Sequence, residues 1–381
     1  MRTLHPVLKR GMMIWDRAGL PPAVFQDRLR RVQAAIAAAD HDAWLVYGDA
    51  QEYGNVAYLT HYLPRVRGAL TLVPRDGPPI LLVAFSSRDV PEAKTLTWVD
   101  DVRPFTRLPP EVVRLVRDQG LDHARLGLVG IEELLSVGEW DVIERELPSV
   151  VWEPAGDALA RLRASKEAPE AAMLRQAATN VRAALDVAAE ALRPGVAERV
   201  ALAEVDRALR YGGAEDTRLL IASGPRASSG LRPPDDRVLA EGDVVLLHAA
   251  ASHQRYWAEG GRTIVLGTPD AETRALLEAA RAAVTALAAA ARPGAPCGAV
   301  ADAALAHLRD PAQAAQALEY GLGHSIGLDL EEPPFLRPGD ATPLPADAAL
   351  ALHVVLHGAA GHGALVEETV LVSDEGTESL A

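Results

Sequence analysis

The stretch Gly323-His324-Ser325-Ile326-Gly327, followed closely by Glu332-Pro333-Pro334, places a histidine beside apolar residues typical of a strand. Two further stretches have the same character: Gly242-Asp243-Val244-Val245-Leu246-Leu247-His248 and Val366-Glu367-Glu368-Thr369-Val370-Leu371-Val372. Strands hold polar side chains rigidly, and several strands can direct such groups to one point. Because these groups lie far apart in the sequence, they predict a polar site that is assembled by folding.

The amino-acid composition limits the classes of protein to which this chain can belong. The 381 residues suffice for two domains or one large one, and a hydrophobic fraction of 49% allows a sizeable core. The net charge is −14 and no long basic run occurs, which argues against nucleic acid as a partner. The longest apolar stretch, 276–291, contains Glu278 and Arg281, so it predicts a soluble helix rather than a membrane span.

Cysteine usage points to a reducing compartment. Cys297 is the only cysteine, so no intrachain disulfide can form, and we expect a cytoplasmic protein. Residues 1–6 lack the apolar segment of a signal peptide, in line with this expectation. Cys297 follows a turn-like stretch at 292–296, and a nucleophilic role stays open as an alternative, although no base is recognisable beside it.

The first 155 residues alternate helix and strand patterns, which predicts an α/β domain with a mostly buried sheet. Apolar residues at helical spacing predict a helix at 22–39. Arg75-Asp76-Gly77 predicts a hairpin between strands at 69–74 and 79–84. The remaining predicted elements are a strand at 43–48, a helix at 111–119, a strand at 126–130, a helix at 131–147 and a strand at 150–152.

The second part of the chain predicts helices over an antiparallel sheet, an α+β arrangement, with domains at 1–155 and 156–381. His253 and Gln254, between two paired strands, are expected at a solvent-exposed hairpin tip. Arg-Pro-Gly recurs at Arg193 and Arg292, each time between two helices, which suggests an internal duplication. Residues 157–192 are predicted to be helical in two parts, and Lys166 to Glu170 is predicted as the entry to the second part, because Pro169 fits a first helical turn. The other predicted helices are 196–211, 271–291, 299–308 and 312–318, and the predicted strands are 219–222, 243–250, 255–265, 348–356 and 364–372.

These motifs resemble those of the creatinase/aminopeptidase family (M24), which includes methionine aminopeptidase, prolidase, Xaa-Pro aminopeptidase and creatinase. The resemblance covers nearly the whole chain, and Asn55–Thr60 resembles the strand-end signature of the creatinase-type N-terminal domain. It implies an α/β N-terminal creatinase-type domain, an α+β pita-bread C-terminal domain and a homodimer. The motifs that occur in the family's order are Ile221-Ala222-Ser223-Gly224-Pro225, Tyr256, Arg262-Thr263, Gly323-His324 and Glu367-Glu368-Thr369.

Metal-dependent members of this family use five ligands, in the order Asp, Asp, His, Glu and Glu. By motif, the resemblance assigns these positions to His248, Glu259, His324, His353 and Glu367, of which only His324 and Glu367 keep the family's residue. Two of four carboxylates are thereby lost, and imidazole cannot bridge two cations as a carboxylate does. The sequence therefore predicts no ordinary dinuclear Mn, Co or Zn site. Because the replacements are still His and Glu, we interpret the pocket as repurposed.

Two chemistries fit this set of residues. In one, the three histidines and a glutamate hold a single divalent transition metal. In the other there is no metal, as in creatinase, and one histidine moves a proton from water to the leaving nitrogen. The predicted catalytic residues are His324, His248, His353 and Glu367. The predicted substrate-binding residues are Glu259, Glu331, Tyr256, His357 and His362.

Three departures from the family pattern bear on the substrate. Leu231 stands where the loop after Gly224-Pro225 normally supplies a histidine, Glu331 replaces a second histidine, and Leu365 replaces an arginine. The loss of the two histidines argues against Xaa-Pro cleavage, so we expect a hydrolase acting on a C–N bond of a small nitrogen-rich metabolite. A metal-dependent Xaa-Pro aminopeptidase or dipeptidase and a non-catalytic M24-like binding protein are the alternatives.

Overall fold

The computed structural model describes residues 14–64, 67–359 and 361–380. The chain forms two compact units, Met1–Arg163 and Ala164–Ala381. The first unit ends at Arg163 rather than at 155, because helix α7 (Gly156–Ala164) is tied to it: Arg163 Nη1 donates to Asn55 Oδ1 at 2.6 Å. No helix among the described residues is long and apolar enough to cross a membrane.

The first unit is built on a six-stranded sheet with the order β4-β3-β2-β1-β5-β6. The pairs β1–β2 and β2–β3 are antiparallel, and the other neighbours are parallel, which confirms an α/β domain. Its strands are β1 (Ala43–Asp49), β2 (Gly68–Pro74), β3 (Ile80–Val83), β4 (Asp101–Pro104), β5 (Arg125–Val129) and β6 (Val151–Pro154). Its other helices are α1 (Pro22–Ala38), α2 (Gly54–Thr60), η1 (Ser87–Asp89), α3 (Val90–Ala93), α4 (Leu108–Asp118), α5 (Ile131–Leu134) and α6 (Val137–Glu146).

Two expectations for this unit are wrong in detail. Asn55–Thr60, expected at a strand end, lies in helix α2, where Thr60 Oγ1 donates to the carbonyl of Val56 one turn earlier. The single helix expected at 131–147 is two helices. Ser136 is extended and precedes α6 as its N-cap residue, so the first helix stops before it.

The second unit has an eight-stranded sheet with the order β11-β10-β12-β13-β9-β8-β7, and β14 pairs with β13 outside this path. Neighbouring strands are antiparallel, which confirms the α+β arrangement. Its strands are β7 (Asp216–Ser223), β8 (Val244–His253), β9 (Tyr256–Val265), β10 (Gly323–Ser325), β11 (Glu332–Phe335), β12 (Ala349–His357), β13 (Gly363–Ser373) and β14 (Gly376–Ser379). Its helices are α8 (Ala168–Ala191), α9 (Glu198–Tyr211), η2 (Gly224–Ser228), α10 (Ala271–Ala290), α11 (Cys297–Leu305) and α12 (Pro311–Tyr320).

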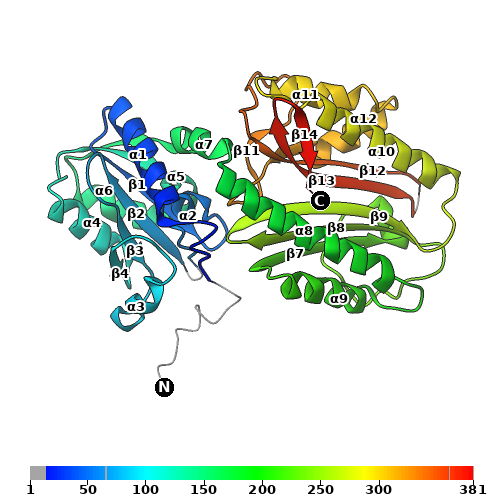
Figure 1. Cartoon of the computed structure of the whole chain (residues 1–381), viewed down its shortest axis with the longest axis horizontal. Helices are drawn as coiled ribbons and strands as arrows, with labels where there is room; N and C mark the ends of the chain where they lie inside the picture. The colour runs from blue at the N-terminus through cyan, green and yellow to red at the C-terminus, as the bar shows by residue number, and fades with distance from the viewer. Residues whose placement is uncertain (1–13, 65–66, 360, 381) are drawn as a thin grey trace. The chain divides into compact units, whose positions relative to one another are not determined.

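Side-chain alternation decides which face of this sheet is polar. In β8, Val245 and Leu247 join the apolar core formed with α8 and α9, so His248 points to the opposite face. In β12, Leu352 and Val354 join the core formed with α10 and α11, so His353 also points away from the helices. Figure 1 shows α8 and α9 along one half of the sheet and α10 to α12 along the other.

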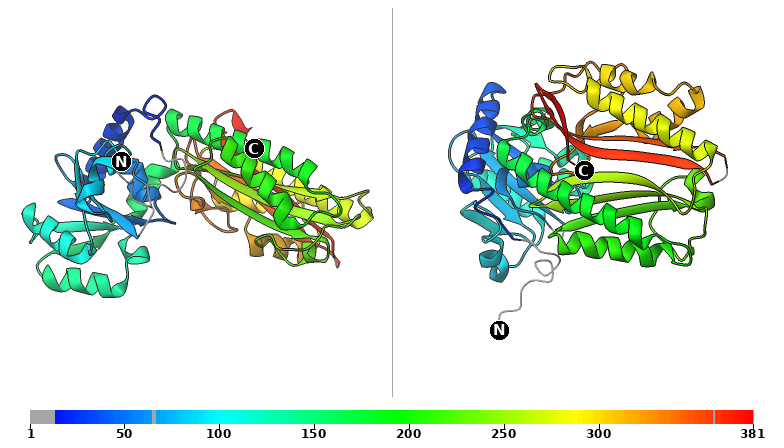
Figure 2. Two further views of the ribbon diagram at one scale, coloured as in Figure 1. Left: turned by 90° about the horizontal axis from the view of Figure 1, so that it is seen from below. Right: turned by 45° about the vertical axis from the view of Figure 1, so that its right-hand side comes forward.

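The two halves of the sheet meet where β13 runs beside β9 (Figure 2, right). Glu367 and Gly261 are the register pair described there. On one side of it, the Thr369 hydroxyl accepts from the amide of Glu259 at 2.9 Å and donates to the carbonyl of the same residue at 2.8 Å. On the other side, the Thr263 hydroxyl makes the same two bonds with Leu365, at 2.8 and 2.9 Å. Threonine side chains thus stand in for backbone hydrogen bonds.

The turn between β8 and β9 differs from expectation. Gln254 is buried, with 3% of its surface exposed, so it is no solvated hairpin tip. Arg255 is fully buried beside Glu215, which accepts from the Arg255 amide at 2.8 Å and from its Nη1 at 2.7 Å. A buried arginine needs such a partner, and this partner lies 40 residues away in the sequence.

Substitution of Thr369 tests the threonine bridge. Thr369→Val keeps the side-chain shape but leaves the buried amide and carbonyl of Glu259 without partners, so we expect a loss of about 2–3 kcal/mol in unfolding free energy. Thr369→Ser keeps the hydroxyl and is expected to cost about 1 kcal/mol, from one lost methyl group. Urea unfolding followed by circular dichroism measures both. Equal losses in the two variants would contradict a role for the hydroxyl.

Candidate functional site

Five polar side chains converge on the face of the second unit's sheet that lies opposite its helices. They are the residues that the sequence predicts as metal candidates: His248 on β8, Glu259 on β9, His324 on β10, His353 on β12 and Glu367 on β13. Four of them are buried, and His353 is half-buried. One hairpin from each half of the sheet contributes to the group, so neither half forms the site alone.

The imidazoles and carboxylates of this group contact one another directly. His248 Nδ1 lies 2.8 Å from Glu367 Oε2. His324 Nε2 lies 3.4 Å from Glu259 Oε1, and His353 Nδ1 lies 3.9 Å from Glu367 Oε1. Each carboxylate thus has at least one imidazole within ion-pairing distance, which offsets the cost of burying its charge.

Two sets of three ligand atoms, each within 4.8 Å of one another, come from this group. One set is Glu259, His324 and His353, and the other is His248, Glu259 and Glu367. His324 Nδ1 donates to the carbonyl of Ser325 at 3.0 Å, which directs Nε2 towards Glu259 in the orientation usual for a metal ligand. His353 Nδ1 is buried without a hydrogen-bond partner among the described residues. The donor set therefore fits a metal ion.

Burial and charge set the protonation of the three imidazoles. Burial lowers the pKa of His248, but Glu367 outweighs it and raises that pKa to about 9. Burial likewise opposes the charge on His324, whose pKa Glu259 raises to about 9. At His353 burial dominates and lowers the pKa to about 4. Near neutral pH His353 therefore offers a free lone pair, whereas metal binding at His324 must displace a proton.

Gly261 provides the space in which Glu367 lies. A Cβ at this position would lie 2.8 Å from Glu367 Oε2 and 2.8 Å from Leu365 Cδ2, closer than side chains approach. The Glu367 carboxylate can therefore occupy its position only because residue 261, its register partner on β9, is a glycine.

A cavity of about 440 Å³ opens onto His324 and His353. Glu331, which the sequence predicts as a substrate contact, lines this cavity. Tyr320 and Arg337 also line it, and the sequence analysis misses both. Tyr320 ends a helix and Arg337 follows a short strand, so neither belongs to a periodic pattern that would have marked it.

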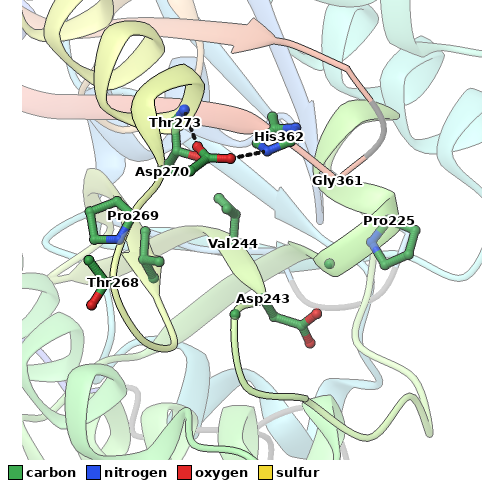
Figure 3. Close-up of a pocket in the computed structure, with 12 residues that line it drawn as sticks. Pro225, Asp243, Val244, Thr268, Pro269, Asp270, Thr273, Gly361 and His362 are labelled. Carbon is green, nitrogen blue, oxygen red and sulfur yellow. Dashed lines mark hydrogen bonds and ion pairs between the residues drawn. The ribbon is translucent and has the colours of Figure 1, made fainter.

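The other predicted substrate contacts lie elsewhere. Tyr256 is buried, with 1% of its surface exposed, and is not part of the lining of this cavity. His362 lines a separate cavity of about 240 Å³, where its Nε2 lies 2.8 Å from the Asp270 carboxylate (Figure 3). His357 does not line the 440 Å³ cavity itself, but its Nε2 lies 3.2 Å from the hydroxyl of Tyr320, which does.

Two of the departures from the family pattern fall in the same part of the apolar core. Leu231 and Leu365 belong to one apolar cluster, together with Val355. The positions where the family resemblance implies a histidine and an arginine thus hold two leucines that belong to the apolar core.

The cysteine alternative is wrong. Cys297 is fully buried at the start of α11, within the apolar core beneath α10. Burial raises the pKa of its thiol to about 11, so the thiolate that a nucleophile requires is disfavoured.

Comparison with known protein families agrees with the motifs. The model of metallopeptidase family M24 matches residues 172–374, and that of the creatinase/prolidase N-terminal domain matches residues 28–165. Probable dipeptidase PepE of Mycobacterium tuberculosis is 30% identical over 232 residues, which are 59% of this chain and 60% of that protein. The Xaa-Pro dipeptidase of Pyrococcus horikoshii is 24% identical over 66% of this chain and 72% of its own length.

Solved structures show the same two-domain fold with its pita-bread C-terminal domain. The prolidase from Pyrococcus horikoshii superposes with a TM-score of 0.82 at 22% identity, covering 93% of this chain and 97% of that one. Dipeptidase PepE from Mycobacterium ulcerans superposes with a TM-score of 0.82 at 23% identity, covering 96% of each chain.

The space at Gly261 can be tested directly. Gly261→Ala places a methyl group against the Glu367 carboxylate, so we expect Zn²⁺ affinity of the apo-protein to fall about 10- to 100-fold. Gly138→Ala is the matched control, because a Cβ there meets no atom within 4 Å. Isothermal titration calorimetry with Zn²⁺ measures both, and wild-type affinity in Gly261→Ala would contradict the steric argument.

Proposed function

The chain belongs to metallopeptidase family M24, and we propose that it is a metal-dependent hydrolase that cleaves the C–N bond of dipeptides. The main support is the set of Glu259, His324 and His353, which lies beside the 440 Å³ cavity that both histidines line. Two imidazoles and a carboxylate are a donor set typical of catalytic zinc, with a position left for water or substrate. Such an ion, when bound, polarises a carbonyl and lowers the pKa of water.

In this proposal His248 and Glu367 support one ion and do not bind a second. Their set shares Glu259 with the first set, so a second ion would depend on the same carboxylate. His248 Nδ1 lies 2.8 Å from Glu367, and a protonated imidazole there supplies the positive charge that a second cation would bring. Each chain then holds one divalent transition metal.

The cavity suits a small zwitterion. Its volume of about 440 Å³ lies within the usual range for small-molecule sites. Glu331 and Arg337 line it with opposite charges, and neither side chain makes a hydrogen bond or ion pair with another described residue. An ammonium group on Glu331 and a carboxylate on Arg337 would satisfy both. This match supports a dipeptide as the substrate.

Hydrolysis of a small nitrogen-rich metabolite without metal is the second candidate. The names of the relatives favour a peptidase over it. Two observations still support it: the pairs His248–Glu367 and His324–Glu259 neutralise each other without an ion, and Leu231 replaces a histidine of the peptidases. The homodimer and the cytoplasmic location expected from the sequence remain predictions alongside both candidates.

Chelation separates the two candidates. We expect the purified protein to cleave members of a dipeptide panel with and without C-terminal proline, to lose this activity after dialysis against EDTA, and to regain it with Zn²⁺, Mn²⁺ or Co²⁺. His324→Ala should lower bound metal and reduce kcat/KM at least about 1,000-fold. His362→Ala is the control, because His362 lines the other cavity. Full activity in the chelated protein would support the metal-free candidate, and no turnover of peptides or amidines would favour a binding protein.

Metal stoichiometry tests the role of His248. Elemental analysis of the wild type is expected to give about one ion per chain, since the imidazole occupies a position where a carboxylate ligand is needed for a second ion. His248→Asp restores this carboxylate, and we expect the ratio to rise towards about two per chain. Two ions per chain in the wild type would contradict the single-ion proposal.

A further inference from the structure

Hydrolysis of an amide needs a group that moves a proton, and this inference rests on the proposed function. Attack by water on the carbonyl carbon releases one proton, and the leaving nitrogen must gain one when the C–N bond breaks. The five side chains of the metal site are already paired with one another or free to bind the ion. The proton carrier must therefore be sought in the wall of the cavity.

Tyr320 is the hydroxyl-bearing side chain in that wall. It ends helix α12, and its Oη lies 3.2 Å from Nε2 of His357, which ends strand β12. His357 Nδ1 lies 2.8 Å from the backbone carbonyl of Ala227. A carbonyl can only accept, so Nδ1 carries a hydrogen and the neutral ring keeps its lone pair on Nε2. The Tyr320 hydroxyl therefore donates to His357.

The backbone around this pair holds it in place. Gly230 has a φ of +96°, and a Cβ there would lie 2.4 Å from Tyr320 Oη, so only glycine leaves room for the hydroxyl. The amide of His357 donates to the side-chain oxygen of Gln316, also on α12, at 3.0 Å. These contacts fix the tyrosine against the histidine, and Tyr320 is one of the residues that line the cavity.

We propose that Tyr320 and His357 form a proton shuttle for the cavity. As water attacks the carbonyl carbon and the C–O bond forms, its proton passes to Tyr320 Oη, and the phenolic proton passes to His357 Nε2. As the C–N bond breaks, Nε2 returns its proton to Tyr320, which protonates the leaving nitrogen. One proton is moved from water to amine, and both side chains end as they began. Tyr320 is the catalytic residue and His357 positions and recharges it.

Besides Glu319, which also lines the cavity, Glu331 is a competing proton carrier in the same wall. Its carboxylate makes no hydrogen bond with a described residue that would orient it, whereas the Tyr320 hydroxyl has a partner with a fixed tautomer. A purely structural role is the other alternative, because the pair also links α12 to the η2 loop that contains Ala227. The experiment must distinguish the shuttle from both.

The test uses the metal-loaded full chain and the dipeptide of the panel above that the wild type cleaves fastest. Tyr320→Phe removes the hydroxyl and keeps the ring. We expect kcat to fall about 100- to 1,000-fold, with KM and bound metal within about threefold of the wild type. His357→Gln should give a similar loss, and the double variant should be no slower than the slower single variant, because the two residues act as one unit. Tyr211→Phe, at an exposed tyrosine, and His362→Gln are the controls.

A second substrate checks the role in leaving-group protonation. The 4-nitroanilide of the dipeptide's first residue releases a weakly basic amine, so the defect of Tyr320→Phe should shrink at least about tenfold on it. An unchanged kcat in Tyr320→Phe, a loss in Glu331→Gln as large as that in Tyr320→Phe, or a loss explained by KM or metal content overturns the shuttle and leaves the proposed function intact. Absence of turnover by the metal-loaded wild type on every substrate overturns the proposed function, and the shuttle with it.

Discussion

Two threonine hydroxyls hold together the junction on which the whole site depends. Thr263 and Thr369 bridge β9 and β13 on either side of the pair formed by Gly261 and Glu367. Each hydroxyl satisfies a buried amide and a buried carbonyl of the opposite strand, which would otherwise cost free energy in the folded state. Since one hairpin with polar ligands comes from each half of the sheet, the ligands face one another only while this junction holds.

The ligand set also constrains which ion suits the site. A group of four carboxylates and one imidazole favours hard cations, whereas three imidazoles and two carboxylates favour transition ions such as zinc or iron. The pairing of His248 with Glu367 places a positive charge inside the group itself, so less cationic charge is needed from outside. Under the proposed function, the exchange of carboxylate for imidazole would therefore change the number and the kind of ions together.

Whether the sequence predicts the role of a residue depends on the element in which that residue lies. His324 and Glu367 lie in or beside apolar stretches that are typical of strands, so their motifs predict both the fold and the candidate site. Tyr320 lies at a helix end, and its proposed role depends on its hydrogen bond with His357. Only folding brings these two residues together. The turn at Gln254 and Arg255 is buried because the distant Glu215 carboxylate accepts hydrogen bonds from Arg255. The local sequence pattern does not reveal such a distant partner. The sequence therefore predicts strands and ligands better than the groups that surround them.

The apolar cluster that contains Leu231 and Leu365 limits which side chains these two positions accept. A histidine at 231 alone or an arginine at 365 alone would place a polar side chain among the aliphatic residues of this cluster. Each single substitution is therefore expected to lower the free energy of unfolding.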